Sequence, residues 1–116
     1  MQKYKIKSEN LINQNGNYAA NQIQTYIYGE EVNQCIFQSY DKTICKIDYC
    51  TGEDFNILIL DKNAYDYSKT TSKYLNIFLK DKYLNIEMIK KSYNIGGCII
   101  DDKYKPLKVI IEDLNN

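Results

Sequence analysis

Residues 65–80 read YDYSKTTSKYLNIFLK, and the rest of the chain is organised around this stretch. Its first half collects hydroxyl-bearing and turn-forming residues, among which Ser68 or Thr70 is a suitable helix N-cap. Three apolar residues of the second half recur at helical spacing and share one face: Leu75, Phe78 and Leu79. The stretch therefore predicts a loop that leads into a helix over about residues 70–80.

The chain before this stretch alternates polar and apolar residues in short runs, which is typical of strands. We expect a first strand over residues 3–7 and then a loop with one helical turn over residues 10–21. Four further strands form a predicted meander of hairpins, at residues 22–28, 32–39, 43–49 and 55–60. The run FNILIL that ends this meander is the most β-prone of the chain and predicts a central strand.

The chain after the first helix predicts a second helix and two edge strands. Asn85 is placed to cap a helix that runs through Tyr93 and stops at Gly96-Gly97. Residues 98–100 and 107–111 then form the two predicted edge strands. The predicted fold class is α+β: a single domain over residues 1–116, with an antiparallel β-sheet of about five or six strands (a hairpin meander) and two short α-helices packed on one side.

Charge and composition argue against several classes of function. Fifteen acidic residues balance fifteen basic ones, all of them Lys, and the chain has neither Arg nor His. A dedicated nucleic-acid binder needs a surplus of positive charge, so we expect no direct nucleic-acid partner. Without His, Ser–His and Cys–His catalytic pairs cannot form. The paired carboxylates Glu53-Asp54 and Asp101-Asp102 read as solvated turn charges, so we expect no catalytic residues and no enzyme activity.

Targeting signals are also lacking in the sequence. No apolar run approaches the roughly 18 residues that a membrane-spanning helix needs. Residues 1–7 alternate and carry no apolar core of a signal peptide. The sequence therefore predicts a cytoplasmic protein that has no membrane partner.

Four cysteines leave two interpretations open. Cys35, Cys45, Cys50 and Cys98 could together hold one structural zinc ion, because four thiolates form a closed tetrahedral site. Strand parity favours the alternative of buried or free thiols, since Cys35 and Cys45 share a hairpin face with Phe37 and Ile47. Two CxxC pairs, which would make a zinc site specific, are missing.

Two segments carry a resemblance to a known group of proteins. The segments are FQSY with TICKI at residues 37–47, and YSKTTSKY leading into Phe78-Leu79 at residues 67–79. Together with Asn21-Gln22-Ile23 they resemble small proteins of unknown function from phages and mobile elements of low-GC Gram-positive bacteria, over about residues 18–80. Such small neutral phage proteins are often inhibitors of host defence, and this chain looks most like an anti-CRISPR protein.

This resemblance implies a function, a partner and a place of action. The implied mechanism is binding to an RNA-guided CRISPR effector nuclease in the cytoplasm of a bacterial host cell, which blocks the loading of guide or target DNA. The predicted contact residues lie before the first helix: Tyr65, Asp66, Tyr67 and Lys69. The alternatives are a nucleic-acid-binding accessory or regulatory protein of a mobile element, favoured by Lys-rich segments interleaved with Tyr, and a small virion or structural protein.

Overall fold

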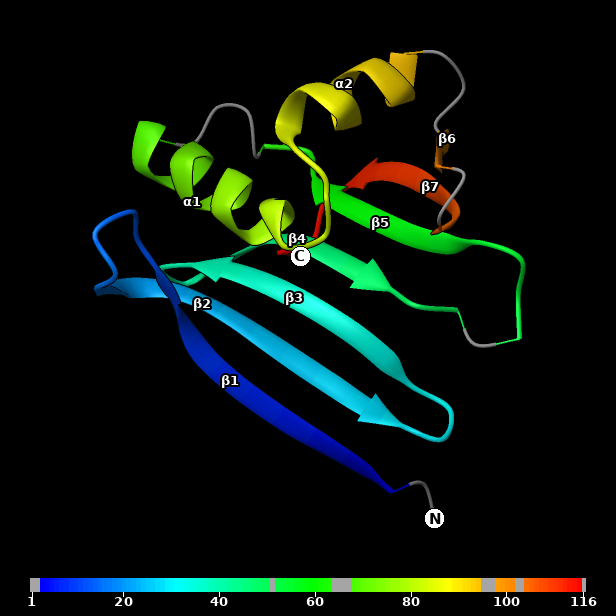
Figure 1. Ribbon diagram of the computed structural model, residues 1–116, viewed down its shortest axis with the longest axis horizontal. Coiled ribbons are helices and arrows are strands. Elements are labelled where there is room, and N and C mark those ends of the chain that lie inside the picture. The colour runs from blue at the N-terminus through cyan, green and yellow to red at the C-terminus, as the bar shows by residue number, and fades with distance from the viewer. Residues whose placement is uncertain (1–2, 51, 64–67, 95–97, 102–103, 116) are drawn as a thin grey trace.

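The computed structural model describes residues 3–50, 52–63, 68–94, 98–101 and 104–115, and it contains one seven-stranded sheet. The strand order is β1-β2-β3-β4-β5-β7-β6. Two helices, α1 (Lys69–Lys80) and α2 (Ile86–Asn94), lie over the same face of this sheet (Figure 1). The predicted α+β class is confirmed. All seven strand segments predicted from the sequence join the sheet, which therefore has one strand more than the five or six predicted for it. No helix within the described ranges is long and apolar enough to cross a membrane.

Five strands form an antiparallel meander, each pairing with the next, which is one strand more than the four-stranded meander that the sequence predicts. They are β1 (Tyr4–Ile12), β2 (Tyr18–Gly29), β3 (Asn33–Ser39), β4 (Lys42–Asp48) and β5 (Asn56–Asp61). A bulge between Phe37 and Gln38 of the β3–β4 pairing lets β4 bury two consecutive side chains, Ile44 and Cys45. The helix-facing side of the meander is therefore mostly apolar, with Gln22, Gln24 and Ser39 as buried polar exceptions.

The predicted loop over residues 10–21 is wrong, because β1 and β2 pair as far as Ile12 and Tyr18. Asn side chains close the short turn that remains. The Asn13 side chain accepts hydrogen bonds from the backbone N–H groups of Asn15 (2.9 Å) and Asn17 (3.1 Å). Gly16 supplies a positive φ of 81° in the same turn. The polar run that predicts a loop is thus the end of a hairpin, and the Asn13 side chain stabilises its turn.

The C-terminal strands depart from the prediction in one respect. β6 (Cys98–Asp101) is an edge strand as expected, but β7 (Tyr104–Glu112) pairs on both sides. Its pairing with β5 is parallel, from Asn56 with Leu107 to Asp61 with Glu112. Pro106 precedes this parallel ladder and lies opposite a register shift in β6, where its missing N–H is tolerated. Residues 107–111 are therefore an interior strand, and this long-range pairing leaves no local signal in the sequence.

Helix boundaries follow from capping side chains. Ser68 is the N-cap of α1, and its Oγ accepts the backbone N–H of Thr71 at 3.2 Å. Asn85 acts in the same way before α2, where its Oδ1 accepts the N–H of Met88 at 2.9 Å. The buried face of α1 carries Leu75, Phe78 and Leu79, as the spacing predicts. Phe78 stacks on Phe37 of β3 with ring centroids 5.5 Å apart, which anchors the helix layer on the sheet.

Candidate interaction surfaces

The contact residues predicted before the first helix fall mostly outside the described ranges. Tyr65, Asp66 and Tyr67 lie there, and only Lys69 is described. Lys69 is the first residue of α1 and is exposed. Their role as a contact surface therefore stays a prediction.

The structure separates the described cysteines into two kinds. Cys35 and Cys45 are fully buried on the helix-facing side of β3 and β4, whereas Cys50 follows β4 and is half-buried. The Cys50 thiol donates to the backbone carbonyl of Asp48 at 3.6 Å. No three Cys, Asp or Glu side chains gather into a metal-holding group within the described ranges. Cys98 lies in β6 but its side chain is not described, so zinc stays a prediction, and the geometry favours buried thiols.

Burial also makes the two core thiols poor metal ligands and poor nucleophiles. It raises the pKa of Cys45 from 9.0 to about 12, and it raises the pKa of Cys35 as well. The Lys82 ammonium acts in the opposite direction on both pKa values. That ammonium lies 3.9 Å from the Phe78 ring centroid and donates to the Phe78 carbonyl at 3.0 Å. At neutral pH both thiols remain protonated, as packed core cysteines do.

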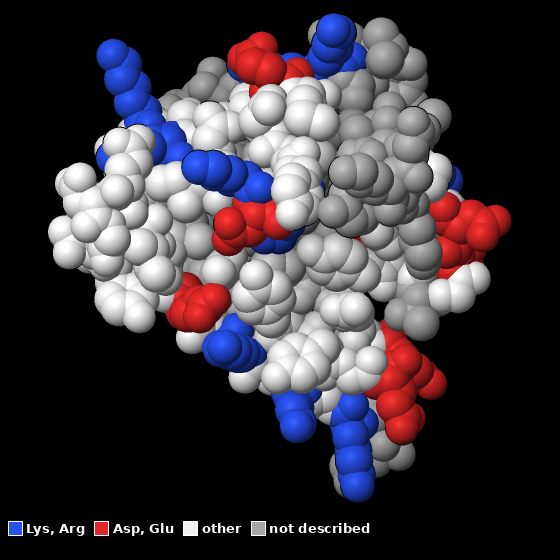
Figure 2. Space-filling model, viewed as in Figure 1, with Lys and Arg blue, Asp and Glu red and all other residues white. Residues whose placement is uncertain are grey.

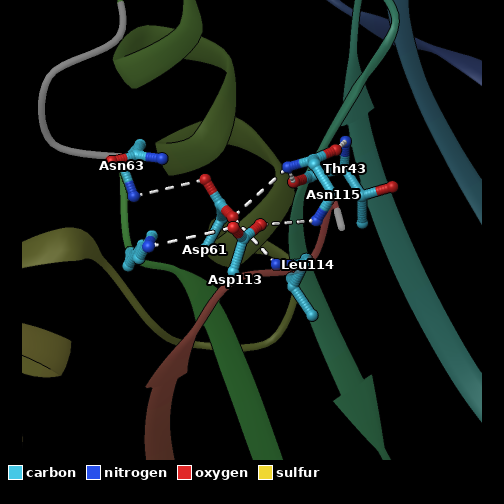
Figure 3. A network of polar contacts seen from close by, with 7 residues as sticks. Thr43, Asp61, Asn63, Asp113, Leu114 and Asn115 are labelled. Atoms are coloured by element: carbon cyan, nitrogen blue, oxygen red, sulfur yellow. Dashed lines mark hydrogen bonds and ion pairs between the residues drawn. The ribbon is translucent and has the colours of Figure 1, made fainter.

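A polar clasp joins the ends of three sheet elements, and it is centred on the fully buried Asp61 (Figure 3). The Asp61 carboxylate accepts hydrogen bonds from the backbone N–H groups of Asn63 (3.2 Å) and Leu114 (3.0 Å). It also accepts the side-chain amide of Asn115 at 3.2 Å. The same Asn115 amide pairs with the backbone of Thr43, accepting its N–H at 2.8 Å and donating to its carbonyl at 3.0 Å.

In the pairing of Asn115 with Thr43, a side-chain amide takes the place of a neighbouring backbone strand. The Asn115 amide bonds both backbone groups of Thr43, as a residue of a neighbouring strand would. The segment after β7 thereby ties the end of β5 to the start of β4 (Figure 3). Because these hydrogen bonds join parts of the chain to one another, we assign the clasp a structural role.

The β1–β2 ribbon, which we define as residues 4–9 paired with residues 24–29, extends beyond the helices (Figure 1). All six β1 residues of the ribbon are exposed, with Tyr4 and Ile6 exposed by 55% and 60%. β1 is the edge of the sheet, so its outer backbone groups face no strand in the described part of the chain. A Cβ on Gly29 would lie 2.5 Å from the Lys3 carbonyl oxygen, so only glycine allows the two strands to approach this closely.

The helix-facing side of the ribbon carries lysines opposite tyrosines. Lys5 pairs with Tyr28, and Lys7 pairs with Tyr26. In Figure 2, blue side chains follow the course of β1 across the lower part of the molecule, with red side chains near both ends of the row. The ribbon is therefore basic and aromatic along its middle but flanked by acidic groups.

The face of the sheet opposite the helices, which we call the open face, is rich in isoleucine. Seven isoleucines share it by strand register: Ile6, Ile23, Ile27, Ile36, Ile57, Ile59 and Ile110. Their alternating neighbours, such as Phe37, Leu58 and Leu60, are fully buried beneath the helices. The isoleucines themselves are half-buried or exposed, because no described element covers them. This apolar face was not expected from the sequence.

A cleft of about 470 Å³ lies between β1 and the end of α1. Its charged walls are Glu9, Lys80 and Asp81, and the Gln24 side chain donates to Glu9 at 2.8 Å. The other amide atom of Gln24, Oε1, is sealed from solvent and has no partner among the described residues. Because this oxygen is inaccessible and the wall charges have both signs, the cleft favours no class of ligand.

The chain is a small α+β domain with an exposed edge ribbon and an apolar sheet face that no described element covers. The family described as "Family of unknown function (DUF8033)" matches residues 4–94, and the chain belongs to this family. The match runs from the start of β1 to the end of α2, so β6 and β7 lie beyond it. No curated protein and no solved structure matches the chain. The family description states no activity, so the resemblance to anti-CRISPR proteins stays a prediction.

Proposed function

We propose that this protein acts by stoichiometric binding to a larger macromolecule, and that its target is an RNA-guided CRISPR effector nuclease of the bacterial host cell. The observation that carries the proposal is the β1–β2 ribbon, whose first strand is exposed over six consecutive residues at a sheet edge. An exposed edge strand offers backbone hydrogen bonds to an extended segment of a partner, and alternate side chains give specificity.

The ribbon has the composition that suits a contact surface. Tyr4 and Tyr28 are exposed by 55% and 43%, and Ile6 shares the face of β1 that carries Tyr4. Tyrosine buries a large ring at low conformational cost and keeps a polar tip, which is why it is enriched in interfaces. The lysines of β1 oppose uncontrolled edge-to-edge pairing, so the ribbon accepts a complementary partner in preference to any strand.

The test is DNA cleavage by a panel of RNA-guided nucleases, with the protein added before guide RNA or before target DNA. We expect loss of cleavage at near-equal concentrations of protein and nuclease, and the order of addition identifies the blocked loading step. The variant Ile6→Asp should relieve inhibition by at least tenfold in concentration. The control Glu87→Gln, at an exposed position of α2, should inhibit like the parent protein.

A second candidate function is supported by the other side of the same ribbon. Lys5 and Lys7 stand opposite Tyr28 and Tyr26, and Lys3 precedes them. Tyr28 is exposed by 43%, whereas Tyr26 is half-buried against the core. Lysines beside an exposed aromatic ring are typical of a surface that binds single-stranded nucleic acid. If the protein is such an accessory factor, it binds a single-stranded oligonucleotide with an affinity that falls steeply with salt. Binding that is undetectable at low salt would contradict this candidate, and it would leave the nuclease inhibitor unaffected.

A further inference from the structure

The open face raises the question of what covers it. Two neighbouring rows of side chains cross it from strand to strand. One row contains Thr25, Ile36, Lys46, Ile59 and Ile110, and the other contains Ile27, Gln34, Asp48, Ile57 and Lys108. Five of these ten side chains are isoleucines, and monomeric proteins seldom expose contiguous apolar patches of more than a few hundred Å².

The size of the open face matches a stable protein interface. Seven strands at about 4.8 Å spacing, each about seven residues long at 3.3 Å per residue, give roughly 700–800 Å² for one face. A standard interface buries about 800 Å² on each partner. The face is therefore large enough for one complete sheet-on-sheet contact and has little area left over for a second one.

The charges on this face are complementary to themselves. Lys46 and Asp48 lie in β4, which has three strands on each side, at adjacent positions of the two rows. Lys46 has no ion-pair partner within the described ranges, and the Asp48 carboxylate accepts only the Gln34 side-chain amide there, at 3.3 Å. The Lys108 ammonium lies over the Phe55 ring, 3.9 Å from the ring centroid. The part of Lys108 that is left to contact a partner on the open face is therefore its apolar methylene chain.

We propose that the open face binds the open face of a second copy of this chain, forming a two-fold dimer. The two-fold axis runs across the strands, between the row of Lys46 and the row of Asp48. Lys46 of each copy then faces Asp48 of the other, and Ile59 faces Ile57. An axis along β4 would instead bring two Lys46 ammonium groups together, which like charges oppose. Two sheets packed in this way lie about 10 Å apart with interdigitating side chains.

The test is the mass of the protein in solution by sedimentation equilibrium, from 1 to 100 μM. We expect twice the chain mass of 13.6 kDa. Lys46→Asp and Asp48→Lys should each weaken the dimer by at least tenfold in Kd. The double exchange Lys46→Asp/Asp48→Lys should restore the parent Kd within about threefold, because each new pair again has opposite signs.

The restoration separates a self-contact from contact with another protein, since only a second copy carries both exchanged charges. Ile36→Lys provides an independent apolar test and should give a monomer, whereas Glu87→Lys on α2 should leave the dimer intact. Circular dichroism checks that each variant is folded. A monomer at 100 μM, or a double exchange that stays as weak as the single variants, would overturn the proposal. Ile36, Lys46 and Asp48 lie outside the ribbon, so their variants test the dimer separately from nuclease binding, whereas Ile6 belongs to both surfaces.

Discussion

The helix-covered half of the sheet and the β1–β2 ribbon are built from similar alternating sequences, yet they differ in almost every physical property. In the covered half, Phe37 and Leu58 are fully buried beneath α1 and α2. In the ribbon, Tyr4 and Ile6 remain more than half exposed. The same alternation thus predicts a strand in both regions, but burial depends on what packs over the strand. Stability should therefore reside in the covered half and binding in the ribbon.

The largest difference between the two regions should appear on deletion of an apolar side chain. We expect Phe37→Ala to lower the free energy of unfolding by about 3–5 kcal/mol, because it removes the ring that stacks on Phe78 and leaves a cavity. The matched change Ile6→Ala in the ribbon should cost about 0.5 kcal/mol, as exposed positions do. Urea denaturation of the two variants makes the comparison, and equal losses would break it.

The clasp extends the comparison to polar groups. Asp61→Ala removes the acceptor of two backbone N–H groups and of the Asn115 amide. We expect it to lower the free energy of unfolding by about 1–3 kcal/mol, because these donors are left without their partner. Asp54→Ala, at an exposed turn position, is the control and should change little. Thermal denaturation with no shift for Asp61→Ala would show that the clasp is dispensable.

Alkaline pH should weaken the covered half in particular. The pKa of Cys45 is 9.0 in the unfolded chain and about 12 in the folded protein, so the folded state binds the thiol proton more tightly. Its contribution to stability is complete below pH 9 and is lost as the pH rises from 9 to 12, at up to about 1.4 kcal/mol per pH unit. Urea denaturation between pH 7 and 10.5 should show this slope, and Cys45→Ala should make it shallower. Tyr49, whose pKa burial raises to about 12, adds a smaller slope of its own above pH 10. An unchanged slope in the variant would contradict the assignment to Cys45.

The smallest predicted effect compares two serines. Ser68→Ala removes the N-cap of α1 and should cost about 1 kcal/mol. Ser8 forms an exposed side-chain hydrogen bond to Thr25 at 2.9 Å within the ribbon. Ser8→Ala should be nearly neutral, because solvent replaces that hydrogen bond. Denaturation midpoints of the two variants measure the difference, and a larger loss for Ser8→Ala would reverse the comparison.

Local chemistry explains which parts of the fold were predictable from the sequence. The hairpin of β2 and β3 and the caps Ser68 and Asn85 depend on neighbouring residues, and these predictions agree with the structure. The hairpin end around Asn13 was predicted wrongly, because side-chain amides replace the loop that a polar composition indicates. The position of β7 depends on parallel pairing with β5, which no local pattern encodes.

The candidate surfaces were harder to predict than the fold. Strand parity correctly placed Cys35 and Cys45 in the core, but it does not state that the opposite face stays uncovered. The run from Ile57 to Leu60 predicts a central strand, and the structure fully buries only Leu58 and Leu60 of it. Of the predicted contact residues, only Lys69 lies in a described range, so a test of that site needs variants at Tyr65 and Tyr67 in the cleavage assay.

The parallel pairing of β5 with β7 has a consequence for how the chain is made. During synthesis β5 emerges long before β7, so one edge of β5 stays unpaired while α1, α2 and β6 are produced. The growing chain therefore carries a temporary apolar edge that includes Leu58 and Ile59, and an unpaired edge of this kind invites aggregation. Insertion of β7 and closure by Asn115 end that exposure. Translation speed and chaperones should therefore influence the yield of this protein more strongly than its small size suggests.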